Sequence, residues 1–426
     1  MGRRRRTLNR WMKCLAWAAL LTIFAAPVLA QQTPLQPASS LQSPSQLLSL
    51  AEALNRAEKQ NLDLQAARAQ RAVALAGVSI AKERPNPSIS ASFSRDAPHE
   101  GVLLDQPLEL GPKRKRRIAL AQQEGVLTED DIITLSRQIR RDVRVAYFSL
   151  LFARSVTAEK TEIARLAQRL KDTAQARFDT GDIAQLELTQ ADLDLSSANA
   201  DAQIAKREEQ IAQSQLNVLL DAPATSSWSL ATGFDAIAGP PSLEELISQA
   251  TDSNAELSRL RQEAKIEELR INLFHSEKIP NLTIEIGTDL NNPPTYEAGL
   301  RGGFSMELPL FSRYQGEIAQ STATLRAIQQ ETEAKRRAIS GLVEATYYEL
   351  NARVAEVGLY KQTLVPASKK LEEMAEDSYK SGKTNILTVL AAQRDVQRVT
   401  SEYLSSLLAM QTSFAEMEET VGVPLD

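Results

Sequence analysis

The stretches RFDTG (Arg177–Gly181) and SYKSG (Ser378–Gly382) mark two places where the chain is expected to turn sharply. Each has an aromatic residue three positions before a glycine. The first follows residues 113–177, which contain no proline and a single glycine. Glycine is the residue that most easily adopts the left-handed conformation at a helix C-terminus. We therefore predict that each stretch ends a long helix in a tight turn.

These two turns belong to an internal duplication that spans most of the chain. Landmarks recur in the same order, separated by between 193 and 202 residues. The paired landmarks are Ser49–Glu52 with Ser242–Glu245, Pro85–Ile89 with Pro280–Ile284, Gln106–Leu108 with Leu308–Leu310, and Tyr147–Phe148 with Tyr347–Tyr348. Such a pattern indicates two copies of one structural unit. We predict a first repeat at 46–225, a linker at 226–241 and a second repeat at 242–426.

Each repeat is predicted to contain a helix, a β-hairpin, a very long helix and a medium helix. Ser49 and Ser242 each precede a glutamate by three positions, a capping box that begins the first helix. That helix is expected to run about 35 residues, until the proline at 85 or 280 ends it. The later elements are predicted at about 88–110, 113–177 and 183–220 in the first repeat, and at about 282–310, 314–380 and 385–420 in the second. Pro366 lies inside the second long helix and predicts a kink there.

Apolar residues in the first long helix recur every three or four positions, as in a coiled coil. They are Ile132, Leu135, Ile139, Val143, Ala146 and Leu150, followed by Ile163, Leu166, Leu170 and Ala174. The next helix carries a seam of mostly small residues at Leu188, Ala191, Leu195, Ala198, Ala202 and Ala205. Because alanine lets helices approach closely, we predict that these helices pack side by side.

Both hairpins alternate between apolar and polar residues, which is the pattern of strands that are wet on one face. In Ser88–Arg95 four serines face away from Ile89, Ala91 and Phe93, and Leu282–Asp289 alternates similarly. This pattern fits a membrane barrel and also a soluble sheet that covers a helical core. Four strands cannot close a barrel, which needs about eight, whereas three copies would supply twelve. We expect the first hairpin to be short, and Asn291–Gly299 to form a long outer loop in the second.

The N-terminal 30 residues are predicted to be a cleaved signal peptide, with a basic start, an apolar stretch and a small-residue cleavage site. Residues 31–45 are predicted to be a flexible linker. The first 30 residues hold six of the 49 Lys and Arg and none of the 54 Asp and Glu, so the remainder has a net charge of −11. This balance argues against a nucleic-acid partner. Cys14 is the only cysteine and leaves with the signal.

Residues typical of catalysis or metal binding are sparse. His99 and His275 are the only histidines and have no ligand spacing. We therefore expect no bound metal, no cofactor and no enzyme activity. The basic run Lys113–Arg117 is interpreted as an interfacial cluster or a solvated helix start.

The order of elements, the duplication and two motifs resemble the outer membrane efflux protein (TolC) family. One motif is the aromatic-x-x-glycine turn; the other is Pro85-Asn86-Pro87 before a strand, followed by QPLELGPKR at Gln106–Arg114. The second motif resembles the heavy-metal, CzcC-like branch, although Pro112 stands where that branch usually has a glycine. The resemblance implies a mainly α protein with a small β part, assembled as a homotrimeric α-barrel with a 12-strand transmembrane β-barrel.

The resemblance also implies a place and a set of partners. The protein would lie in the outer membrane, in contact with its lipid, with a large periplasmic portion. It would dock on a periplasmic adaptor and an inner-membrane pump of the RND type. Adaptor docking would fall on two tip turns, Phe178–Ile183 and Tyr379–Thr384. The residues assigned to docking are Phe178, Gly181, Asp182, Ile183, Tyr379, Gly382 and Lys383.

The family's aspartate pair at the pore entrance is missing here, because the corresponding positions are Thr388 and Ala391. Glu187 matches the acidic position after the first turn and is the candidate for an entrance constriction; a solvated surface carboxylate is the alternative. The function implied is the outer-membrane channel of a tripartite efflux system that conducts metal cations or drugs. The alternative from the residues alone is a soluble periplasmic coiled-coil scaffold.

Overall fold

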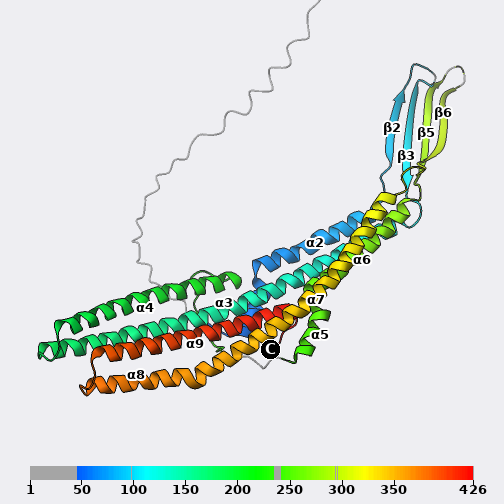
Figure 1. The fold of residues 1–426 in the computed structure, drawn as a ribbon. Coiled ribbons are helices and arrows are strands. Elements are labelled where there is room, and N and C mark those ends of the chain that lie inside the picture. The colour runs from blue at the N-terminus through cyan, green and yellow to red at the C-terminus, as the bar shows by residue number, and fades with distance from the viewer. Residues whose placement is uncertain (1–45, 97, 235–240, 293, 295, 426) are drawn as a thin grey trace, which may run out of the picture. The chain divides into compact units, whose positions relative to one another are not determined.

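The computed structural model describes residues 46–96, 98–234, 241–292, 294 and 296–425. The predicted signal peptide at 1–30 and the linker at 31–45 lie outside the described residues. Figure 1 shows a mainly helical chain with a small β part, in agreement with the expected fold class. Among the described residues, no helix is both long enough and apolar enough to cross a membrane.

The first repeat contains four α-helices and three strands among its described residues. They are β1 (Gln46–Leu48), α1 (Leu50–Gln60), α2 (Leu62–Lys82), β2 (Ser88–Phe93), β3 (Glu100–Leu108), α3 (Lys113–Asp179) and α4 (Gln185–Leu219). Ser49 caps α1 by accepting a hydrogen bond from the Glu52 backbone N–H, as its capping box predicts. Helix α3 is a single unbroken helix of 67 residues.

From its first helix onward, the second repeat has the same order of helices and hairpin strands, with its long helix divided. They are α5 (Leu243–Ser253), α6 (Ala255–Glu277), β5 (Leu282–Asn292), β6 (Tyr296–Met306), α7 (Gln315–Leu359), a π-helical segment η1 (Tyr360–Leu364), α8 (Val365–Lys380) and α9 (Ile386–Val421). Strand β4 (Trp228–Leu230) lies in the stretch between the repeats and pairs in parallel with β1. The segment predicted as a linker therefore contributes to a small two-stranded sheet.

The first helix of each repeat is broken, and the expectation of one continuous helix of about 35 residues is wrong. Asn61 separates α1 from α2 with ψ 127°, and its side-chain oxygen accepts from the Leu64 backbone N–H. Its side-chain nitrogen donates to the Leu219 carbonyl at the end of α4. Asn254 breaks the second copy in the same way. An asparagine that caps the next helix and binds a distant backbone carbonyl stabilises the interruption.

The second long helix is interrupted where the sequence places its proline. The π-helical η1 ends two residues before Pro366, which lies in the first turn of α8. Proline has no N–H to donate, and its ring crowds the carbonyl four residues earlier. The wider π-turn removes that conflict. The irregularity expected at Pro366 is therefore a local change of helix type on its N-terminal side.

The two hairpins join into one antiparallel sheet of strand order β2-β3-β5-β6. Strand β3 of the first repeat pairs with β5 of the second, from Glu100↔Leu290 to Leu108↔Leu282. The second hairpin differs from expectation, because Asn291, Asn292 and Tyr296–Gly299 belong to strands, and only residues 293–295 lie between them. The strands therefore stay paired up to Asn292↔Tyr296, closer to the end of the hairpin than expected.

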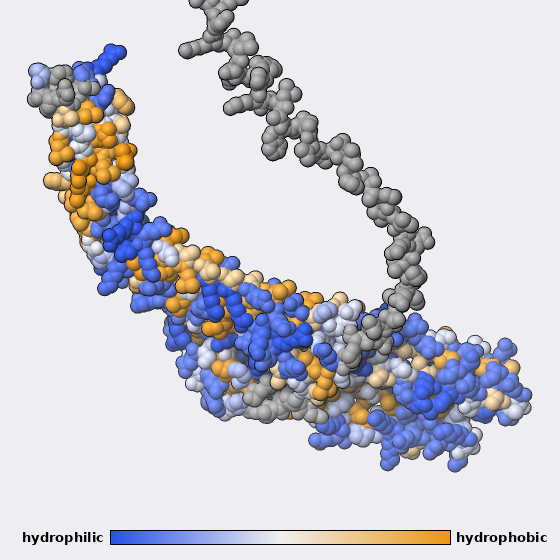
Figure 2. All heavy atoms as spheres, turned by 180° about the vertical axis from the view of Figure 1, so that it is seen from behind, coloured by the Kyte–Doolittle hydropathy of each residue, from blue (hydrophilic) through white to orange (hydrophobic). Residues whose placement is uncertain are grey.

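The alternation predicted in the hairpins gives the sheet one apolar and one polar face. The apolar face has Ile89 and Phe93 on β2, Val102, Leu104 and Leu108 on β3, Ile284 and Ile286 on β5, and Leu300, Phe304 and Met306 on β6. The polar face carries the serines of β2, Asp105, Glu285 and Arg301. Figure 2 shows apolar residues gathered over the strands. In the single chain these side chains are exposed, with Leu300 at 91% and Phe304 at 77%.

The helical part is held together by narrow seams. Helix α4 packs on α3, α3 on α9, and α9 on α8 (Figure 1). Ala191, Ala198, Ala205 and Ala212 of α4 are buried and lie seven residues apart. The predicted alanine seam therefore packs as a coiled coil does. The largest core cluster surrounds Tyr147 of α3, whose hydroxyl donates to the Leu48 carbonyl and accepts from the Thr232 N–H.

Candidate functional site at the helical turns

The two tip turns share one backbone geometry. Gly181 has φ 79° and Gly382 has φ 68°, so both adopt the left-handed conformation predicted from the sequence. In the first turn the Asp182 N–H donates to the Arg177 carbonyl and the Gly181 N–H to the Phe178 carbonyl. In the second turn Lys383 and Gly382 donate to Ser378 and Tyr379 in the same way. This is the Schellman motif, which satisfies the last carbonyls of each helix.

The predicted docking residues differ in how far they are available to a partner. Gly181, Asp182, Gly382 and Lys383 are exposed at the turns, whereas Phe178 and Ile183 are half-buried. Tyr379 is buried, with 4% of its surface exposed. The exposed residues of the turns are therefore glycines or polar and charged residues, and the aromatic residues Phe178 and Tyr379 are less exposed.

The tip turns of the two repeats contact each other. Tyr379 belongs to a cluster that includes Ala174 and Ala191 of the first repeat and Ile386, Val389 and Leu390 of the second. The Arg177 guanidinium lies 5.1 Å from the centre of the Tyr379 ring, close enough for a cation–π interaction. The residues predicted from the two sequence copies, about 200 positions apart, thus lie together at one end of the helical part.

Glu187 lies in the first turn of α4, half-buried, next to this cluster. Among the described residues it has no ion-pair partner. Thr388 and Ala391, which stand where the family has aspartates, are exposed on α9.

A cavity between the two repeats was not anticipated from the sequence. It has a volume of about 410 Å³ and lies among α3, α4, α8 and α9. Its charged lining residues are Glu159, Glu162, Asp194, Asp201, Lys369, Glu372 and Arg394. Arg394 of α9 pairs with Asp194 of α4 at 3.4 Å and so links the repeats. Glu159 lies four positions before Ile163, a residue of the predicted apolar seam. A carboxylate at a seam position was therefore the sequence feature that could have indicated this cavity.

The pKa values of two carboxyl groups in this cavity are raised, which favours the protonated forms. Burial raises the pKa of Glu159, and Lys160 lowers it by less. Neither carboxylate oxygen of Glu159 has a hydrogen-bond partner among the described residues. Burial also raises the pKa of Glu372, and repulsion from Glu376 adds to that shift. Desolvation disfavours the charged form of a carboxyl group, which is the physical cause of both shifts.

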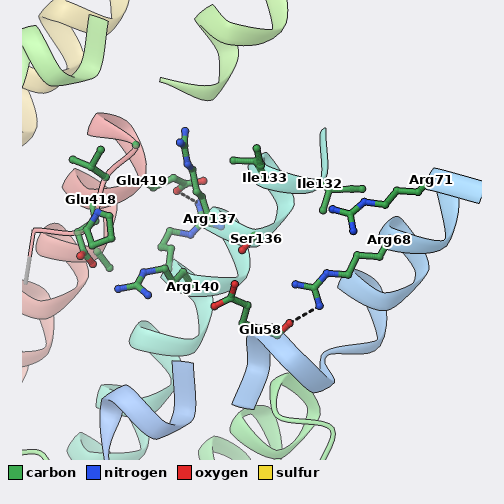
Figure 3. A pocket seen from close by; sticks show the side chains of 15 residues that line it. Glu58, Arg68, Arg71, Ile132, Ile133, Ser136, Arg137, Arg140, Glu418 and Glu419 are labelled. Carbon is green, nitrogen blue, oxygen red and sulfur yellow. Dashed lines mark hydrogen bonds and ion pairs between the residues drawn. The ribbon is translucent and has the colours of Figure 1, made fainter. Parts of the chain in front are cut away.

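A second cavity, of about 360 Å³, is rich in arginine but is already internally paired (Figure 3). Arg68 donates to the Glu58 carbonyl, and Arg137 donates to the Ser253 carbonyl. Arg71 pairs with Glu129 and Arg141 with Glu419, each at 2.6 Å. These contacts tie α1 to α2, and they tie α2, α5 and α9 to α3. Within the described part of the chain, no group of three or more His, Cys, Asp or Glu side chains is placed to hold a metal ion.

Two characterised proteins are similar to this chain along most of its length. The cobalt-zinc-cadmium resistance protein CzcC of Cupriavidus metallidurans is 24% identical over 363 residues, covering 84% of this chain and 86% of that protein. The outer membrane protein TolC of Vibrio cholerae is 23% identical over 404 residues, covering 87% and 91%. Both alignments span the two repeats.

A solved structure has the same fold. The channel protein CusC superimposes with a TM-score of 0.72 at 15% identity, covering 89% of this chain and 94% of that one. The sequence pattern of the outer membrane efflux protein family matches residues 53–221 and again 246–423. It therefore matches each repeat in turn and most of the chain. The chain belongs to the outer membrane efflux protein family.

Proposed function

We propose that three copies of this outer-membrane efflux channel assemble into a passive duct, with a 12-strand β-barrel in the membrane and a helical barrel in the periplasm. The observation that carries the proposal is the open sheet. It has an exposed apolar face, and within the described residues β2 and β6 are its unpaired edge strands. Unpaired edges invite further strand pairing. Pairing β6 of one copy with β2 of the next would close the sheet after three copies, with twelve strands.

The helical part supports the same assembly. Helix α4 carries an exposed apolar stripe on a face away from its alanine seam, formed by Leu186, Leu193, Ile204, Ile211 and Val218. Helix α8, at the other side of the α4-α3-α9-α8 layer, exposes Leu371 and Met374. Contiguous exposed apolar surface of this kind marks an interaction site. A head-to-tail contact between the α4 side and the α8 side would close into a ring.

Membership of this family favours a channel over the soluble scaffold that the residues alone left open. The channel would connect an inner-membrane RND-type pump, through a periplasmic adaptor, to the cell exterior. Its substrates would be metal cations, as the name of the similar CzcC protein suggests, or drugs. Pro112 stands where the heavy-metal branch usually has a glycine, so the motif does not fully match that branch. The proposal therefore includes both metal cations and drugs. A deletion strain challenged with a panel of metals and drugs tests this choice directly.

Glu187 is our candidate for the entrance constriction. Three copies around an axis would form a ring of carboxylates, an arrangement that favours cations. In planar-bilayer recordings Glu187→Gln should lower the cation selectivity of the channel. Glu208, an exposed glutamate further along α4, provides the matched control as Glu208→Gln. Unchanged reversal potentials for Glu187→Gln would reduce the residue to a surface carboxylate.

The assembly itself is tested by fractionation and cross-linking. The channel should require detergent for extraction and should run as a trimer, whereas a soluble scaffold would be released by osmotic shock. Cysteines at Asp182 and Lys383 should cross-link to the adaptor, because both side chains are exposed at the tip turns. A cysteine at Glu344, exposed on α7, serves as the control. Cross-links confined to the control position or the sheet end would contradict docking at the tips.

A further inference from the structure

A groove at the base of the sheet is lined by both cations and apolar side chains. It has a volume of about 830 Å³. Arg84 lies between α2 and β2, Gln106 and Leu108 come from β3, and Arg114, Lys115 and Ile118 come from the first turns of α3. The groove therefore lies where the strands of the first repeat meet its helices.

The groove opens on the apolar face of the sheet. Side chains alternate along a strand, so Gln106 and Leu108 share a face with Val102 and Leu104. The register places that face next to Ile89 on one side and Ile286 on the other. Moving along β3 from Leu104 toward Leu108, a ligand would pass from an apolar surface directly onto the cations of α3. An apolar surface followed by charged groups is the arrangement found at a membrane interface, where the hydrocarbon region meets the lipid headgroups.

The basic run at the start of α3 divides into two functional groups. Lys113 is buried and contacts Glu277 at 3.4 Å and Asn281 at 2.7 Å, while Arg117 pairs with Glu109 at 2.5 Å. These two cations hold the junction together, and the pairing of Glu109 neutralises the one acidic residue that lines the groove. Lys115 and Arg84 have no ion-pair partner among the described residues.

Arg114 contributes a further cation to this outward-facing group. It donates through Nε to the Lys82 carbonyl at 2.8 Å, and within the described residues no carboxylate pairs with its guanidinium. The groove therefore presents three cations, Arg84, Arg114 and Lys115, without paired acids. A planar guanidinium suits phosphate oxygens, which it binds through two parallel hydrogen bonds.

We propose that this groove binds the headgroup of an anionic phospholipid from the periplasmic leaflet of the outer membrane. Arg84, Arg114 and Lys115 contact the phosphate, and an acyl chain lies on Leu108 and Leu104. The proposal rests on the apolar face of the sheet being the lipid-facing side of the channel. It commits to a lipid because the cations adjoin that apolar face, an arrangement that a soluble phosphate does not require.

Native mass spectrometry of the detergent-purified protein tests the proposal. The protein is titrated with dioleoylphosphatidylglycerol or dioleoylphosphatidylcholine, and the retained lipids are counted. The wild type should retain the anionic lipid preferentially. The double variant Arg84→Gln with Lys115→Gln should lose about fivefold in affinity for each cation removed, because a basic residue near an anionic membrane contributes about 1 kcal/mol. Within the described residues neither side chain makes a hydrogen bond or an ion pair, so the fold does not depend on them. Arg84→Lys with Lys115→Arg should keep the preference for the anionic lipid.

Lys206→Gln with Arg337→Gln removes the same charge from exposed sites on α4 and α7 and is the matched control. Equal loss in the control would mean that net charge alone attracts the lipid, and would overturn the assigned groove. Displacement of the lipid by millimolar inorganic phosphate would overturn the choice of occupant. A channel that inserts and conducts but shows no lipid preference would refute the groove alone. A protein that never enters membranes would refute the proposed function as well.

Discussion

The two repeats follow one plan but differ in their long helices. Helix α3 runs unbroken for 67 residues, whereas the second copy is divided into α7, the π-helical η1 and α8. Counting back 16 positions from the tip glycines, Pro366 corresponds to Arg165 in the first repeat. A single proline thus accompanies the difference between an unbroken long helix and one with a π-helical segment. We infer that any bending of the tips relative to the sheet is concentrated in the second repeat.

The copies also differ near their centres. Arg144 of α3 is buried, stacks 4.2 Å from the centre of the Phe414 ring and pairs with Glu418 of α9 at 2.9 Å. Its counterpart in the second repeat, three residues before Tyr347, is the exposed Glu344. The first repeat therefore binds α9, the last helix of the second repeat, through a buried ion pair. At the corresponding position the second repeat has Glu344 in place of the arginine. The first repeat acts as the anchor of the pair.

Replacing Arg144 should cause the largest loss of stability among these predictions. Arg144→Met leaves the Glu418 carboxylate without its cation in a nearly buried site, and breaking a buried pair in this way costs about 3–5 kcal/mol. Glu344→Met changes an exposed residue and should stay within about 0.5 kcal/mol. Denaturant unfolding in detergent measures both. Equal effects would contradict the assignment of the first repeat as the anchor.

The difference between the long helices can be reversed by exchanging their residues. Arg165→Pro places a proline in the interior of α3 and should destabilise it by about 3 kcal/mol. Pro366→Ala should restore α-helical hydrogen bonding across η1, with a gain smaller than that because the π-turn already accommodates the ring. Hydrogen exchange at Tyr360–Leu364 should slow in Pro366→Ala. Unchanged exchange there would show that the π-turn does not depend on the proline.

The cavity between the repeats predicts a dependence of stability on pH. Burial raises the folded-state pKa of Glu159, so the folded protein binds this proton more tightly than the unfolded chain. The contribution of Glu159 to the stability of the folded state is most favourable below its usual pKa of 4.5. It is lost as the pH rises through the raised pKa of the folded state.

Glu159→Gln should therefore stabilise the protein at neutral pH and have little effect at pH 4. A buried polar group without a partner costs about 1–3 kcal/mol, and this sets the upper limit of the gain. Melting curves from pH 4 to 8 measure the change. Glu208→Gln alters an exposed carboxylate of α4 that lies outside the cavity lining, and it is the control. A destabilisation by Glu159→Gln at neutral pH would show that the carboxylate has a favourable partner in the assembled protein.

Features that depend on local sequence could be predicted, and features that depend on distant partners could not. The tip glycines and the two-faced strands follow from backbone freedom and side-chain alternation. The breaks at Asn61 and Asn254 were missed because helical periodicity continues across them. Their stability comes from contacts with Leu219 and Thr420, which lie far along the chain.

The candidate site shows the same division. The sequence identified Tyr379 as a tip residue by its position, but its burial depends on Ala174 and Ala191 of the other repeat. The cavity around Glu159 is formed by four helices from both repeats. In the sequence it is indicated only by a carboxylate at a position of the apolar seam. The connection between β5 and β6 was expected to span the nine residues Asn291–Gly299, but only three residues lie between the strands, because the ladder extends to the pair Asn292↔Tyr296.

The smallest expected effect concerns the feature that both repeats retain. Nothing lies within 4 Å of a Cβ placed on Gly181 or Gly382, so alanine there meets only the backbone penalty of positive φ, about 1–2 kcal/mol. Gly181→Ala and Gly382→Ala should therefore loosen each tip turn equally, and hydrogen exchange at the turns measures this.

Asparagine tolerates the left-handed conformation better, so Gly181→Asn should restore most of the loss. Gly422 provides the contrast. It also has positive φ, but its Cβ would lie 2.8 Å from the Ser253 carbonyl oxygen and 2.9 Å from Arg137, so Gly422→Ala should destabilise the protein more than either tip variant. Unequal losses at the two tips would mean that contacts outside the protomer restrain one of them, and the turn with the larger loss would then be the better candidate for adaptor docking.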